Sequence, residues 1–381
     1  MAGLPLSRRA FVVAITGAAL APVLAAPAHA ATRAPFGRYG SPAARLTERT
    51  LYVHPGGLGD HTTVQAAVTA AGGTSQAFST GGDSGCTLVL APGIYRETVA
   101  VGVARTEMTW IGASGDPRDV VIVYDNAAGS PKPGGGTYGT TGSATTTVQA
   151  DGFTARSITF ANDFLRADHP EITGTQAVAI KVQGDRSAFL GCRFLGHQDT
   201  LYADSMALGT FTRQYYRDCY VEGDVDFVFG RATAVYERCH FRTLNRTDLA
   251  GAPYGFVFAP STAAANPRGY LVTRGRVTSG APDAYYKLAR PWVPSSDPTA
   301  RPMLTVRDTR LAAGIDAVAP YTNMSDSYPW QSQRFAEYRN SGPGAEVTVP
   351  GNRPQLTRGE AGSATREAYL GDWTPWQREG C

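Results

Sequence analysis

The sequence carries little charge and almost no lysine. Charged residues make up 18% of the 381 positions, and lysine occurs only at 132, 181 and 287. The formal net charge is +3 and the basic residues form no stripe, so we expect neither nucleic acid nor a membrane surface as a partner. The six histidines show no metal-ligand spacing, and we expect no metal and no other cofactor.

Long hydrophobic runs are absent after the first thirty residues. Near the N-terminus, Ser7, Arg8, Arg9 and Phe11 match the start of a twin-arginine signal, and an apolar run from 12 to 24 follows. This run is shorter than the roughly 20 residues that a membrane span needs. It ends at a small-x-small cleavage pattern over residues 28–30. We therefore expect residues 1–30 to be a signal peptide and the protein to be secreted, extracellular and not membrane-bound.

Cysteine is scarce and odd in number. The five cysteines are Cys86, Cys192, Cys219, Cys239 and Cys381. Export would place the chain where disulfides persist, but an odd number leaves at least one free thiol.

Glycine and proline, in contrast, are abundant. The chain has 43 Gly and 25 Pro beside 43% hydrophobic residues, which excludes a helical bundle or a disordered chain and favours a turn-rich β protein. Residues 31–48 are small and aperiodic, which is typical of a linker. No break in composition follows until about 350, so we predict one domain over 49–381, and a monomer.

An internal repeat indicates the fold. Five strand-like octets end at Phe160, Phe194, Val221, Phe241 and Val277, at intervals of 34, 27, 20 and 36 residues. Short strands that return at such intervals with variable inserts are typical of a parallel β-helix. An antiparallel sandwich is the alternative, but the octet returns in the same sense each time. We therefore predict an all-β protein, a parallel β-helix.

The repeat also aligns three cysteines. Cys192, Cys219 and Cys239 share one octet position, so in stacked coils they would lie about 4.8 Å apart. That separation allows a Cys192–Cys219 disulfide, and it equally allows a ladder of buried thiols.

The same register pairs two carboxylates. Asp199 lies seven residues after Cys192, and Asp226 lies seven after Cys219. Stacked coils would hold these acids roughly 5 Å apart, where both do not ionise easily at neutral pH. One would act as an acid and the other as a base or nucleophile.

Two such acids fit a retaining glycosidase or an ester hydrolase that uses a carboxylate nucleophile. Acyl transfer also needs a donor to a developing oxyanion. Gln198 precedes Asp199, and Gln176 opens QAVAIKV, which we predict to be an apolar strand, so both amides are candidates for that donor. Each glutamine alone is more often a structural hydrogen-bonder.

Six motifs in order carry a family resemblance. They are GIYRETV at 93–99, QAVAIKV at 176–182, GHQDTLY at 196–202, GDVDFVFG at 223–230, LARPW at 288–292 and EYRNSGPGA at 337–345. Together they resemble the pectin methylesterases, a family of carbohydrate esterases. The resemblance implies a metal-free, right-handed parallel β-helix that hydrolyses the C6 methyl esters of polygalacturonate in pectin and releases methanol.

The resemblance also implies roles for individual residues. Asp226 would be the nucleophile and Asp199 the acid and base, and Gln176 and Gln198 would hold the oxyanion. Arg290 would keep Asp226 ionised. Two aromatic residues of the same motifs would contact the substrate, Trp292 by stacking on a sugar ring and Phe229 as an apolar wall.

Two positions depart from the family pattern, Ala289 where glycine is usual and Arg231 where asparagine or serine is commoner. Neither is expected to touch the chemistry. The stretch 131–147 reads as a flexible loop beside the cleft or as an inert insertion. A β-helical lyase or glycosidase and a non-catalytic pectin-binding β-helix are the competing hypotheses.

Overall fold

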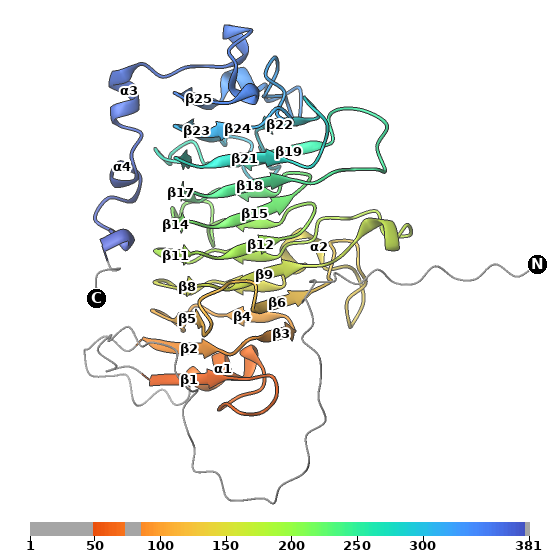
Figure 1. Cartoon of the computed structure of the whole chain (residues 1–381), viewed down its shortest axis with the longest axis vertical. Coiled ribbons are helices and arrows are strands. Elements are labelled where there is room, and N and C mark those ends of the chain that lie inside the picture. The colour runs from red at the N-terminus through yellow and green to blue at the C-terminus, as the bar shows by residue number, and fades with distance from the viewer. Residues whose placement is uncertain (1–48, 73–84, 378–381) are drawn as a thin grey trace, which may run out of the picture. The chain divides into compact units, whose positions relative to one another are not determined.

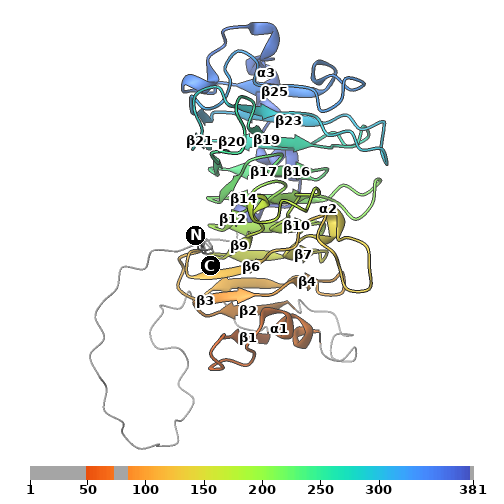
Figure 2. The ribbon, with the colours of Figure 1, turned by 90° about the vertical axis from the view of Figure 1, so that its right-hand side faces the viewer.

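The strands wind into parallel coils. The computed structural model describes residues 49–72 and 85–377. Within these residues the strands form three sheets, every strand pair within them is parallel, and neighbours in each sheet come from successive coils (Figures 1 and 2). The predicted parallel β-helix is confirmed.

Each sheet runs along the stack of coils. The first sheet contains β1 (Arg49–Val53), β2 (Cys86–Leu90), β5 (Thr109–Gly112), β8 (Thr154–Arg156), β11 (Ser187–Leu190), β14 (Arg213–Arg217), β17 (Thr233–Glu237), β20 (Tyr270–Thr273), β23 (Met303–Arg307) and β25 (Arg334–Tyr338). The second contains β3 (Gly93–Arg96), β6 (Val120–Tyr124), β9 (Thr159–Asn162), β12 (Arg193–Leu195), β15 (Tyr220–Gly223), β18 (His240–Thr243), β21 (Arg276–Ser279) and β24 (Arg310–Leu311). The third contains β4 (Val99–Val101), β7 (Thr146–Val148), β10 (Ile180–Val182), β13 (Leu201–Ala203), β16 (Val228–Gly230), β19 (Gly255–Pro260) and β22 (Tyr286–Ala289).

The sequence repeat gives the register of the second sheet. Its five octet ends pair in the order of the chain, Phe160 with Phe194, Phe194 with Val221, Val221 with Phe241, and Phe241 with Val277. The prediction that each octet is a single strand is wrong. Each octet contains a strand of the first sheet, a corner, and a strand of the second sheet. The corner residue has a positive φ in all five octets, at Ser157, Gly191, Asp218, Arg238 and Arg274.

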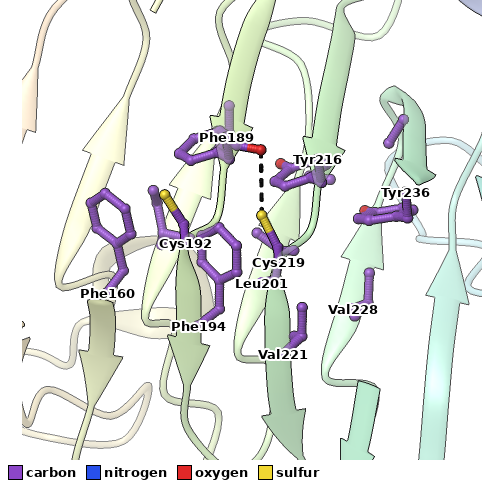
Figure 3. Close-up of a cluster of buried hydrophobic side chains, with 14 of the residues drawn as sticks. Phe160, Phe189, Cys192, Phe194, Leu201, Tyr216, Cys219, Val221, Val228 and Tyr236 are labelled. Carbon is purple, nitrogen blue, oxygen red and sulfur yellow. Dashed lines mark hydrogen bonds between the residues drawn. The ribbon is translucent and has the colours of Figure 1, made fainter. Parts of the chain in front are cut away.

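The three aligned cysteines are buried just after this corner. Each thiol donates to a backbone carbonyl: Cys192 to Ala155 at 3.5 Å, Cys219 to Phe189 at 3.3 Å and Cys239 to Tyr216 at 3.4 Å. All three thiols are free, so the structure has the ladder of buried thiols and not the disulfide. Figure 3 shows two of them, Cys192 and Cys219. Cys381 lies outside the described residues.

Aromatic stacking continues along the same interior. Phe189 stacks on Tyr216 with ring centroids 5.0 Å apart, and Tyr216 stacks on Tyr236 at 4.8 Å (Figure 3). Because parallel register places equivalent side chains above one another, apolar rings gain contact in every coil. The core is therefore continuous from coil to coil.

Short helices cover parts of the coils. Helix α1 (Val64–Ala71) packs against β1, β2 and β4, and α4 (Arg366–Leu370) packs against β14 and β17. The tail buries Leu370 and Trp373 against outward-facing apolar side chains of the first sheet, so it belongs to the same unit. Figure 1 shows α4 beside the ends of β14 and β17. The remaining helical segments are α2 (Gly139–Gly142), α3 (Arg358–Gly362), and the 3-10 turns η1 (Arg166–Asp168), η2 (Trp330–Ser332), η3 (Pro343–Ala345), η4 (Pro350–Asn352) and η5 (Pro375–Gln377).

The expected signal peptide at 1–30 and linker at 31–48 lie outside the described residues. Among the residues that the structure does describe, no helix has the length and apolar character to cross a membrane.

Candidate active site

Two aspartates occupy equivalent positions on adjacent coils of the third sheet. Leu201 pairs with Val228, which places Asp199 and Asp226, each two residues earlier, in the same register. Both have a left-handed backbone, with φ of 66° and 49°, a conformation that aspartate tolerates better than most residues. The register predicted from the cysteine spacing is therefore confirmed.

A cavity of about 490 Å³ opens over these aspartates. It brings together all seven residues that the sequence predicted for the site. They are Gln176, Gln198, Asp199, Asp226, Phe229, Arg290 and Trp292.

Arg290 is bound to Asp226 through both carboxylate oxygens. Its Nε donates to Oδ1 at 2.8 Å and its Nη2 donates to Oδ2 at 2.5 Å. The guanidinium also lies over the Phe256 ring, 3.9 Å from the centroid, which fixes its plane. Burial raises the pKa of Asp226, and the hydrogen bonds and charge of Arg290 oppose that rise.

Asp199 has a different environment from its neighbour. It is 7% exposed, and among the described residues no hydrogen bond or ion pair reaches its carboxylate. Burial first, and then the charge of Asp226, raises the pKa of Asp199 well above the usual value, while Arg290 opposes this from a distance. The site therefore combines a carboxylate paired with arginine and a carboxyl group that favours its protonated form.

The two glutamines lie on the loop before β10 and the turn before β13. Thr175 Oγ1 donates to Gln198 Oε1 at 2.8 Å, which leaves the Gln198 amide Nε2 to donate elsewhere. Ala177 N donates to the Gln198 carbonyl at 3.1 Å and so fixes the two segments together. The expected strand over 176–182 is shorter, since only Ile180–Val182 joins the sheet.

Aromatic side chains form one wall of the cavity. The rings of Tyr202 and Phe229 stack with centroids 4.2 Å apart, and Trp292 lies against both at 6.2 and 5.7 Å. Gly230 follows Phe229 with φ of 121°, and a Cβ there would lie 2.0 Å from the Ala203 carbonyl oxygen. Glycine is thus required for this wall to approach the preceding coil.

A buried ion pair lies close in sequence to the predicted nucleophile position. Arg166 Nη1 and Nη2 donate to the two carboxylate oxygens of Asp224 at 2.6 and 3.0 Å, and His197 Nδ1 lies 3.5 Å from the same carboxylate. Asp224 is two residues from Asp226, whereas Arg166 belongs to the loop that later carries Gln176. The pair therefore anchors that loop to the coil of Asp226.

Sequence reasoning missed several residues that line the cavity. Tyr202 ends the GHQDTLY motif, so its position three residues after Asp199 was the available signal. The other missed residues, Thr140, Thr141, Ala259, Ser296 and Met324, carried no motif, and Arg231 was not expected to matter. The two threonines come from the 131–147 stretch, which therefore contributes to the cavity wall.

The arrangement of the described His, Cys, Asp and Glu side chains bears on metal binding. Over 49–72 and 85–377, no group of three or more His, Cys, Asp or Glu side chains is arranged to hold a metal ion.

Known proteins share both this sequence pattern and this architecture. The Pectinesterase family model matches residues 50–372. Pectinesterase 31 of Arabidopsis thaliana is 34% identical over 334 residues, covering 85% of this chain and 93% of that protein. The structure of the pectin methylesterase PemA from Erwinia chrysanthemi superimposes with a TM-score of 0.73 at 29% identity, covering 86% of this chain and 98% of that one. A pectin methylesterase solved in complex with a hexasaccharide gives the same TM-score and identity, covering 85% and 97%. The chain therefore belongs to the pectinesterase family.

Proposed function

We propose that this protein hydrolyses the C6 methyl esters of polygalacturonate with Asp226 as nucleophile and Asp199 as general acid and base. Its family membership supports the coarser statement, that it is a carboxylic ester hydrolase with pectin methylesterase activity. The residue roles rest on the asymmetry between the two aspartates.

In the first half of the reaction, a carboxylate oxygen of Asp226 attacks the ester carbonyl carbon. The amide N–H groups of Gln176 and Gln198 stabilise the negative charge that develops on the carbonyl oxygen. Asp199 gives its proton to the departing methoxide, and methanol leaves. The substrate acyl group is then bound to Asp226 as an anhydride.

In the second half, Asp199 is ionised and serves as the base. It takes a proton from a water molecule, which attacks the acyl carbon and releases the free galacturonate. Asp226 returns to its carboxylate form and Asp199 is protonated again. Arg290 remains paired with Asp226 and favours its ionised state as the leaving group.

The observation that carries these roles is the placement of Arg290. Its two hydrogen bonds go to Asp226, whereas Asp199 is buried beside that charge without a cation of its own. A nucleophile must be ionised and a general acid must be protonated. Exchanging the roles of the two residues would oppose both preferences.

The expected substrate is methyl-esterified homogalacturonan. The aromatic wall of Tyr202, Phe229 and Trp292 suits the apolar faces of sugar rings. We further propose that the protein acts as a secreted monomer after twin-arginine export. Replacing Arg8 and Arg9 by lysine should keep the protein inside the producing cell, and an unchanged yield outside it would contradict that route.

Methanol release from methylated pectin tests the mechanism. The isosteric variants Asp226→Asn and Asp199→Asn should each lower kcat by about 10³-fold or more, because each removes an essential group. Asp218→Asn, at an exposed corner of the coils, is the matched control and should retain activity. Full activity in either active-site variant would refute the assigned pair.

A further inference from the structure

Arg231 adds a second cation to the cavity. The lining residues that the structure describes include two basic side chains, Arg231 and Arg290. Arg290 is committed to Asp226 by two hydrogen bonds. Arg231 is therefore the cation of the lining that is available to an anionic ligand.

A ladder of polar side chains fixes the orientation of Arg231. Its members follow the strands β7, β10, β13 and β16 directly, on four successive coils. Gln149 Nε2 donates to Gln183 Oε1 at 3.2 Å, and Gln183 Nε2 donates to Asp204 Oδ2 at 3.2 Å. Arg231 Nε donates to Asp204 Oδ1 at 2.9 Å and so completes the ladder.

The guanidinium keeps donors for a ligand. It has five N–H groups, and Nε–H donates to Asp204. The Tyr202 hydroxyl interacts with both Arg231 and Asp204. Its side chain is 13% exposed, and that of Asp204 is 5% exposed. A guanidinium held in one plane at a cavity wall is well suited to bind a carboxylate through two parallel hydrogen bonds.

Arg231 lies away from the point of ester attack. Asp226 precedes strand β16 and Arg231 follows it, so the three residues of an extended strand, roughly 10 Å, separate the two. Phe229 lies between them in the sequence and contributes to the aromatic wall. A carboxylate bound by Arg231 would therefore belong to a neighbouring sugar, not to the sugar whose ester is cleaved.

We infer that Arg231, oriented by Asp204, is a specificity-determining residue that binds the free carboxylate of a galacturonate unit near the methyl ester under attack. This inference rests on the proposed function. It makes a demethylated neighbour a favourable feature of the substrate. Without Arg231, the carboxylate of Asp204 would lose its cationic partner, and its charge would make such a neighbour unfavourable.

The test compares two substrates on each variant. One is a fully methyl-esterified oligogalacturonide, and the other is the same oligomer after partial alkaline de-esterification. The measured quantity is the ratio of kcat/KM per methyl ester, partly esterified over fully esterified. Arg231→Gln should lower this ratio by about tenfold, the effect of losing a charge-assisted pair, and Arg231→Lys should lower it less.

Arg238→Gln is the matched control. Arg238 is also paired with an aspartate, Asp218, but its side chain is 44% exposed at a corner between the first and second sheets. This variant should leave the ratio unchanged. High salt should lower the wild-type ratio but should not lower the Arg231→Gln ratio, because the attraction that salt screens is absent from the variant.

The outcomes separate the two proposals. An Arg231→Gln ratio equal to that of the wild type would overturn the role of Arg231. If Arg231→Gln does not fold, Arg231→Lys and the salt titration of the wild type test the role of Arg231. A ratio that changes in neither experiment would also overturn that role. Absence of methanol from the fully esterified oligomer with wild-type protein would instead refute the proposed function.

Discussion

Arg290 binds both carboxylate oxygens of Asp226 while its guanidinium lies over the ring of Phe256, 3.9 Å from the centroid. The arginine therefore cannot turn toward Asp199 without losing two hydrogen bonds and the ring contact. This fixed geometry makes two otherwise equivalent aspartates chemically different.

Arg290→Gln should shift the acidic limb of the pH profile of kcat/KM to higher pH. Burial raises the pKa of Asp226, and Arg290 opposes that rise, so its removal raises the pKa further. We expect a shift of about one unit or more and a loss of roughly 10- to 100-fold at neutral pH. Arg290→Lys keeps the charge and should shift the limb less. An unmoved limb in Arg290→Gln would show that Asp226 does not depend on this pair.

Thr175→Val should lower kcat with little change in KM. The Thr175 hydroxyl donates to Gln198 Oε1, and without it the amide is free to turn away from the developing oxyanion. We expect a loss of about tenfold, against about 10²-fold for Gln198→Leu, which removes the donor itself. Thr175→Ser restores the hydroxyl and should restore kcat. If Thr175→Val keeps full kcat, the hydrogen bond has no positioning role.

Asp224→Asn should destabilise the fold by about 3 kcal/mol at neutral pH, because it breaks a buried ion pair. Burial raises the pKa of Asp224, but hydrogen bonds from His197 and Arg166 outweigh it and hold the pKa below the usual value. The stability that Asp224 contributes is therefore present above its unfolded pKa of about 4 and is lost as the pH falls through the lower folded pKa.

Urea denaturation at several pH values measures this effect. The difference between wild type and Asp224→Asn should be largest near pH 7 and should shrink below about pH 4. Asp248→Asn, which removes the exposed carboxylate of the ion pair with Arg246, is the control and should cost under about 1 kcal/mol. A pH-independent difference would contradict the linkage.

The buried thiols should react only after unfolding. Cys192, Cys219 and Cys239 are each 1% exposed, and burial raises the thiol pKa of Cys192 and Cys219. A thiol reagent should leave these three unmodified in the folded protein and modify all three in denaturant without reductant. Their protection in denaturant until a reductant is added would reveal disulfides instead.

Much of this architecture could be predicted from the spacing of the repeated octets. The octets at Phe194 and Val221 predicted the register of adjacent coils, and with it the pairing of Asp199 and Asp226, because a parallel coil repeats the same backbone geometry. The corner inside each octet was missed, since no single residue type marks its left-handed position: Ser157, Gly191 and Asp218 all adopt it.

The remaining parts of the site depend on contacts between segments far apart in the sequence. Sequence alone predicted the coil register, the pairing of Asp199 with Asp226, and the motif residues around these two aspartates. Only the tertiary structure decided that Thr140 and Met324 complete the cavity wall, that Arg166 anchors a loop to Asp224, and that Arg231 faces the cavity while paired with Asp204. The physical reason is that strand register follows from a regular backbone, whereas loops of variable length meet through side-chain packing and charge pairing that no repeat encodes.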